Sequence, residues 1–65
     1  MQYVFVIEDG KVKDAYEFHP EAGFMLRKEE WTGVAVEEIE DKLKTQFESV
    51  KKLREAGNEI VYEVK

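Results

Sequence analysis

The sequence predicts a small two-layer α+β domain, with an antiparallel or mixed sheet of three to four strands and one long amphipathic helix packed on one face. Three observations predict this fold class. The first 18 residues hold two β-branched and aromatic runs, and residues 35–56 repeat apolar side chains at helical spacing. Residues 59–64 place Ile60, Tyr62 and Val64 on one face of a strand, with Glu59 and Glu63 on the other. The predicted element order is strand, strand, a third strand or short helix, helix and strand, in a single domain over residues 1–65.

The first two strands are predicted over residues 2–8 and 11–18. Asp9-Gly10 joins them, and this dipeptide suits a type I′ turn because both central residues of that turn need a positive φ. A two-residue loop fixes the register of the hairpin. The expected pairs are Ile7 with Val12, Phe5 with Asp14, and Tyr3 with Tyr16, and this face, extended by Phe18, is expected in the core.

His19-Pro20 begins a break, because proline cannot continue a central strand. Residues 24–31 after it fit either a third strand, with Phe24 and Leu26 inward, or a short helix. Gly23 before the segment and Thr32-Gly33 after it favour the strand.

The helix is predicted over residues 35–56, where apolar residues recur at spacings of three and four. Acidic residues are concentrated near its start and basic residues near its end, which complements the helix dipole. Gly57 is expected to follow the helix as its left-handed C-terminal residue, before a half-buried strand over 59–64. The apolar stripe comprises Val36, Ile39, Leu43, Phe47, Val50 and Leu53.

Composition excludes several classes of protein. The chain has 65 residues and no cysteine, so neither a disulfide framework nor a thiolate metal site holds the fold. It carries no apolar run long enough for a membrane helix and no signal-peptide pattern, so we expect a cytoplasmic protein without membrane contact. A net charge of −5 argues against nucleic-acid binding. A surface rich in Glu and Lys and poor in Asn and Gln is typical of thermostable proteins and of designed ones.

The inventory of catalytic side chains is thin, and we predict that the chain is not an enzyme. His19 is the only histidine and Ser49 the only serine, and their spacing does not bring them together. His19 is expected to titrate in solvent at a strand end. No metal-binding or phosphate-binding motif is present, so no catalytic, cofactor or metal site is predicted.

Two surfaces are candidates for partner binding. Six carboxylates within thirteen residues surround a tryptophan and could engage a positively charged channel on another protein. The residues proposed for this patch are the tryptophan and five of these carboxylates, namely Glu29, Glu30, Trp31, Glu37, Glu38 and Asp41. An alternative role for Trp31 is to seal one end of the core, as for Met25.

The second candidate surface is the sheet face away from the helix, which we expect to be only half polar. Val4, Val6 and Ala15, together with Val61, are expected on it. A contiguous apolar surface of this kind commonly marks a partner site, so we predict self-association as a homodimer, through this face or through an edge strand.

The element order, with the Pro20 break and Val36-Glu37-Glu38-Ile39 opening a helix, resembles small HicB-type antitoxins. The Pro-Gly-Cys and Gly-Asp-Thr signatures of that family are missing, so no site is transferred from it. We predict a non-enzymatic protein-interaction module, such as a phage- or plasmid-encoded inhibitor of the anti-CRISPR kind that binds a protein partner. The alternatives are an antitoxin or small regulator that binds a toxin or nucleic acid, and a designed or uncharacterised scaffold.

Overall fold

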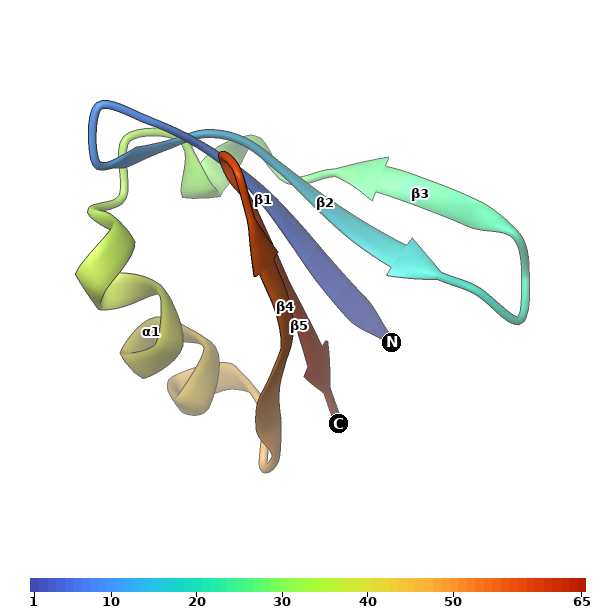
Figure 1. The fold of residues 1–65 in the computed structure, drawn as a ribbon. Coiled ribbons are helices and arrows are strands. Elements are labelled where there is room, and N and C mark those ends of the chain that lie inside the picture. Colours follow the sequence, from blue (N-terminus) through green and yellow to red (C-terminus); the bar gives the residue numbers. More distant parts are fainter.

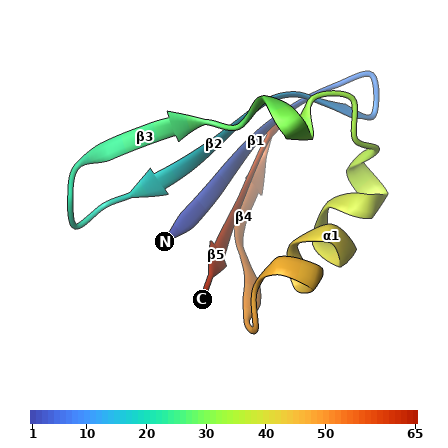
Figure 2. The same cartoon turned by 180° about the vertical axis from the view of Figure 1, so that it is seen from behind.

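A computed structural model describes residues 1–65 as a five-stranded antiparallel sheet with one short helix on one face (Figures 1 and 2). The strands are arranged in the order β3-β2-β1-β5-β4. The predicted α+β class is confirmed, whereas the sheet has more strands and the helix fewer residues than predicted. The elements are β1 (Gln2–Glu8), β2 (Lys11–His19), β3 (Phe24–Arg27), the 3-10 turns η1 (Glu29–Trp31) and η2 (Val36–Glu38), α1 (Ile39–Gln46), β4 (Val50–Ala56) and β5 (Glu59–Val64).

The β1–β2 hairpin has the predicted turn but a different register. Asp9 and Gly10 have φ values of 54° and 75°, as a type I′ turn requires, and Ile7 lies opposite Val12. A bulge between Val6 and Ile7 then shifts the pairing by one residue. The observed pairs are Phe5 with Ala15 and Tyr3 with Glu17, so the expected pairs with Asp14 and Tyr16 are wrong.

The shift in register changes which residues of β2 face the helix, because side chains alternate along a strand. Ala15 is turned into the core, where it is only 1% exposed. Tyr16 and Phe18, expected in the core, lie on the opposite face of the sheet, in register with Val4 and Gln2 of β1.

The segment 24–31 divides into two structures. β3 forms over Phe24–Arg27, as the strand interpretation predicts, and Glu29–Trp31 forms a 3-10 turn instead of continuing the strand. All four residues of β3 are exposed, because the β2–β3 hairpin projects beyond the region that the helix covers (Figure 1). Phe24 and Leu26 therefore do not enter the core as expected.

The predicted helix over 35–56 is wrong in its second half. The α-helix ends at Gln46, and the chain becomes extended at Phe47, with φ −132° and ψ 146°. Residues 50–56 form β4 along the outer edge of β5, where Val50 pairs with the buried Val64. Gly57, with φ 60°, opens the two-residue turn of the β4–β5 hairpin and is not a helix cap.

The core lies between the sheet and the helix and is largely aromatic. Trp31 is 1% exposed, and its ring meets Phe5 edge to face at a centroid distance of 4.9 Å. Tyr3 packs against both rings, and Ile39 and Leu43 of α1 close the layer from the helix side. A helix of two turns is long enough to close the core, because the aromatic rings of the sheet and of η1 already fill most of it. The helix adds only two buried side chains.

Candidate functional site

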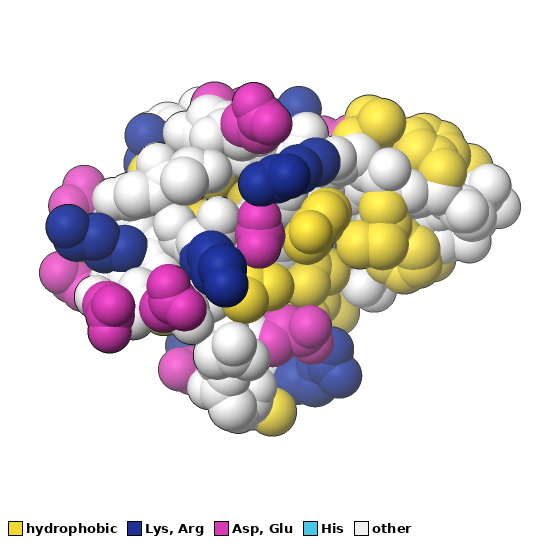
Figure 3. Space-filling model, turned by 90° about the horizontal axis from the view of Figure 1, so that it is seen from above, with side chains coloured by type: hydrophobic (Ala, Val, Ile, Leu, Met, Phe, Trp, Pro, Cys, Tyr) yellow, Lys and Arg dark blue, Asp and Glu magenta, His cyan; other side chains and the backbone are white.

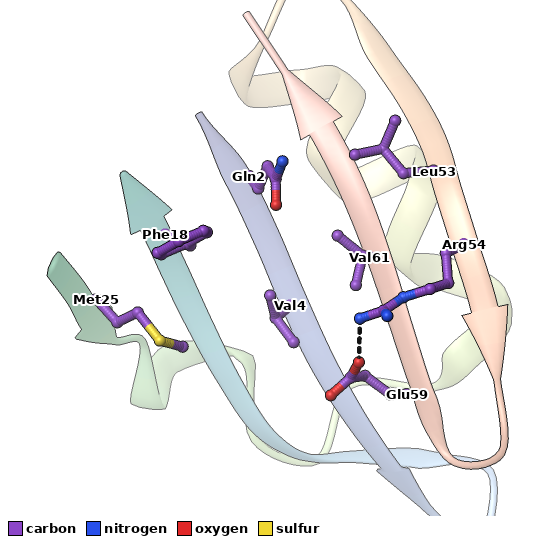
Figure 4. A pocket seen from close by; sticks show the side chains of 8 residues that line it. All are labelled: Gln2, Val4, Phe18, Met25, Leu53, Arg54, Glu59 and Val61. Atoms are coloured by element: carbon purple, nitrogen blue, oxygen red, sulfur yellow. Dashed lines mark hydrogen bonds and ion pairs between the residues drawn. The ribbon is translucent and has the colours of Figure 1, made fainter. Parts of the chain in front are cut away.

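The sheet face opposite the helix is uncovered and is the main candidate for a functional surface. Antiparallel sheets with one solvent-exposed face normally place polar side chains on that face. Here the exposed face has apolar residues on every strand, running from β3 across to β4 (Figure 4). Those that line its central hollow are Val4, Phe18, Met25, Leu53 and Val61.

The hollow has a volume of about 490 Å³, and Val4 and Val61 lie at its centre as direct neighbours in the β1–β5 register (Figure 4). Val61 is only 5% exposed, although it lies outside the core cluster under the helix. Phe18 and Met25, which are paired across β2 and β3, lie on one side of the hollow. Leu53 lies on the other side of the hollow. A register shift between Lys52 and Arg54 of β4 leaves Leu53 without a partner on β5, and both Leu53 and Arg54 line the hollow. The curvature of the sheet therefore provides a concave apolar surface without a second core.

Two ion pairs flank the hollow on this face. Arg27 Nη2 lies 2.9 Å from Asp14 Oδ1 towards the β3 edge. Arg54 forms an ion pair with Glu59 beside the hollow (Figure 4). A partner that contacts the hollow therefore meets an apolar centre between two neutralised pairs of charges.

The projecting β2–β3 hairpin extends the apolar surface. Phe24, Met25 and Leu26 are 45%, 50% and 47% exposed, and Leu53 is the one other large hydrophobic residue of comparable exposure. Figure 3 shows hydrophobic side chains gathered towards the hairpin end of the molecule, while charged side chains predominate at the other end. Apolar exposure is thus concentrated on one hairpin and on the adjoining hollow.

On the helix side of the sheet, a polar cluster is centred on Glu17. Tyr3 Oη donates a hydrogen bond to Glu17 Oε1 at 3.1 Å, and His19 Nε2 lies 2.6 Å from Glu17 Oε2. Lys28 Nζ lies 3.7 Å from the same carboxylate. The hydrogen bond with His19 lowers the pKa of Glu17, with help from Tyr3 and Lys28. Burial and the bond to Glu17 raise the pKa of Tyr3 to about 12.

This cluster fixes the base of the projecting hairpin. His19 is held by Glu17 and stacks on Phe24 of β3 at a centroid distance of 4.6 Å. Ser49 lies on the segment between α1 and β4 and forms backbone hydrogen bonds with Lys65, in a different part of the chain from the cluster. The arrangement therefore links β1, β2 and β3.

The structure separates the residues of the predicted acidic and aromatic patch. Trp31 is buried in the core, so its placement on a binding surface is wrong and its alternative core role is correct, whereas Met25, which was given the same alternative role, is 50% exposed. Glu30 pairs with Lys28 at 3.5 Å. The remaining carboxylates are exposed and form no ion pair, and their role in binding stays a prediction. They are Glu29, Glu37, Glu38 and Asp41.

Of the residues predicted for self-association, Val4 and Val6 lie on the uncovered face, whereas Ala15 does not, because the bulge turns it into the core. Sequence reasoning missed Phe18 and Leu53, which it assigned to the core and to the helical stripe. The Gly57-Asn58 dipeptide was a usable signal for Leu53, since it is also a hairpin-turn pair between two strand-like runs. The bulge that redirects Phe18 has no comparable signal in the sequence.

The described chain contains no group of three or more His, Asp or Glu side chains placed to hold a metal ion. Neither the α-helix nor the 3-10 turns have the length and apolar character that spanning a membrane requires. In comparisons with known proteins, no family model, no curated protein and no solved structure matches this chain.

Proposed function

We propose that this chain is a non-enzymatic protein-binding module whose binding surface is the hollow on the uncovered face of the sheet. The observation that carries the proposal is that this face of the sheet has apolar side chains at positions where a solvent-exposed face normally has polar ones. Val4, Phe18 and Val61 occupy positions that water would normally reach, and they form the centre and one side of a hollow of about 490 Å³. An apolar surface of this kind commonly marks a site of protein interaction, which favours a role in recognition.

The chemistry of the hollow selects the kind of partner. The nearby cations Arg27 and Arg54 are paired with carboxylates, and the chain carries a net charge of −5, so a phosphate backbone finds no free cationic track. An apolar ridge on a protein, such as one face of an amphipathic helix or a loop with aromatic side chains, complements the hollow. Aromatic and methionine side chains at its border, such as Phe18 and Met25, are types enriched at protein interfaces.

The test is capture of a protein partner by immobilised wild-type chain and by a Val4→Lys variant. Val4 lies at the centre of the hollow, so a lysine there places a charge in the contact and is expected to reduce retention by at least about tenfold. Lys13→Glu is a control that changes an exposed charge of β2 outside the hollow. Circular dichroism confirms that each variant is folded.

The same experiment separates the hollow from the acidic surface. Reversal of Glu29, Glu37, Glu38 and Asp41 to lysine is expected to leave capture intact if the hollow is the site. Loss of capture on charge reversal, with full retention by Val4→Lys, would overturn the proposal in favour of the acidic surface. Whether binding inhibits the partner, as for a phage-encoded inhibitor, or neutralises a toxin is decided by the activity of the captured protein with and without this chain.

A further inference from the structure

The two edges of the sheet differ in how they are protected. β4 carries four charged side chains, Lys51, Lys52, Arg54 and Glu55, a pattern that discourages pairing with another strand. β3, at the other edge, has the sequence Phe-Met-Leu-Arg, and all four of its residues are exposed. One edge is thus guarded by charge, while the other presents an apolar strand.

The backbone N–H and C=O groups of β3 point alternately towards β2 and away from the sheet. Lys28 donates its backbone N–H to Ala15 of β2, so the groups of Lys28 are directed towards β2. Because these directions alternate along an antiparallel strand, Leu26 also faces β2, whereas the N–H and C=O groups of Met25 and Arg27 point away from the sheet. These two residues can therefore accept another strand.

We propose that β3 pairs antiparallel with β3 of a second copy of this chain, about a two-fold axis at Leu26. In this register, Met25 of each copy lies opposite Arg27 of the other, so the outward-pointing backbone groups form two hydrogen-bonded pairs. Leu26 lies opposite its own counterpart on the helix side of the joined sheet, and Phe24 lies opposite the aliphatic stem and ammonium group of Lys28. The pairing joins two five-stranded sheets edge to edge.

Local charge favours a second copy as the occupant. The chain as a whole carries −5, but residues 16–28 contain two acidic and two basic side chains and are formally neutral. The two ends of β3 are oppositely charged, since Glu21 lies in the turn that precedes the strand, whereas Arg27 and Lys28 lie at its other end. An antiparallel two-fold brings the basic end of each β3 towards the acidic end of its partner's hairpin. This association is independent of partner binding in the hollow, which stays open on the sheet face.

Single-cysteine variants test the register directly, because the chain has no cysteine of its own. Residues opposite each other at a non-hydrogen-bonded position have Cα atoms about 4.5 Å apart, within the range of a disulfide. With oxidised glutathione as the oxidant, Leu26→Cys is expected to form a covalent dimer at least about tenfold faster than Met25→Cys. Leu53→Cys is the matched control, since Leu53 is exposed to a similar extent on the other edge strand, 43% against 47%.

Sedimentation velocity over a range of concentrations gives the second readout. The wild type is expected to approach twice its mass of 7.7 kDa at high concentration, and Leu26→Lys is expected to weaken the dimer about tenfold, because like charges then meet on the axis. Leu53→Lys is expected to change the dissociation constant less than about twofold. A wild type that stays monomeric at all concentrations would overturn the proposal, as would a dimer broken by Val4→Lys but not by Leu26→Lys. Equal cross-linking of all three cysteine variants would also overturn it.

Discussion

Replacement of Trp31 by alanine is the most informative test of how this chain is held together. The side chain is 1% exposed and comes from a 3-10 turn of three residues, so packing and not local hydrogen bonding holds it in place. Removing a buried tryptophan costs about 3–5 kcal/mol. Domains of this size have a total free energy of unfolding of about 3–10 kcal/mol. Trp31→Ala is therefore expected to leave the chain largely unfolded near room temperature.

The contacts of the ring allow a graded version of this prediction. Trp31 meets Phe5 and Tyr3 edge to face at centroid distances of 4.9 and 6.0 Å, and Lys42 Nζ lies 5.7 Å from the ring centroid. Trp31→Phe keeps an aromatic ring against Phe5 and is expected to cost about half as much as alanine. Lys42→Ala removes only the exposed cation–π contact, which is expected to cost about 0.5–1 kcal/mol.

Urea denaturation followed by far-ultraviolet circular dichroism measures these differences, since tryptophan fluorescence is lost in the two Trp31 variants. Leu53→Ala is a control for hydrophobic truncation at a half-exposed site, where we expect about 1 kcal/mol or less. If Trp31→Ala unfolds within about 0.5 kcal/mol of the wild type but no longer binds a partner, then Trp31 is a surface contact and our account of the core is incorrect.

Three further predictions concern the turn of the β4–β5 hairpin and the cluster around Glu17. Gly57→Ala places a side chain at φ 60° and is expected to cost about 1–2 kcal/mol in thermal unfolding; no loss would show that the turn adopts another conformation. The pKa of Tyr3 is raised to about 12, so the wild type is expected to lose stability as the pH rises from about 10 towards 12, a loss that Tyr3→Phe reduces. The pKa of Glu17 is lowered, so its contribution is present above its unfolded value of about 4.3 and lost as the pH falls through the folded one. The stability gap between wild type and Glu17→Gln should therefore close in acid, and a gap constant from pH 3 to 7 would contradict the assignment.

The hairpin formed by β1 and β2 was predictable as far as local chemistry controls it. Asp9-Gly10 specifies the turn, and Ile7 pairs with Val12 as the turn dictates. Beyond this point the bulge between Val6 and Ile7 governs the register. A bulge becomes favourable when it places the right side chains in the core, here Ala15 in place of Asp14, and the sequence pattern alone does not reveal that choice.

The region 50–56 shows how local pattern and tertiary context can conflict. Val50 and Leu53 continue the helical spacing set by Ile39 and Leu43, and Lys and Arg suit a helix end, so the local pattern favours a helix. The structure places Val50 beside Val64 and leaves Leu53 on the far face of the sheet. A strand wins there because it satisfies the free backbone edge of β5, a need that exists only once the sheet has formed.

The candidate site was also predictable only where local sequence decides the structure. The half-polar character of the face with Val4 and Val6 was visible in the alternation of β1, because side-chain direction along one strand is a local property. The addition of Phe18 and Leu53, and the removal of Trp31 and Ala15 into the core, depend on contacts between distant segments.

The sequence by itself determined the α+β class, the first hairpin turn, the strands at both ends and a helical segment that begins near residue 36, as a 3-10 turn before α1. These features depend on turn chemistry, strand propensity and short-range periodicity, which operate within about ten residues. Only the tertiary structure decided the fifth strand, the register beyond the bulge and the composition of the hollow. These features depend on which arrangement buries the aromatic core and pairs the free edge of β5. Both effects come from contacts between segments that are far apart in the chain.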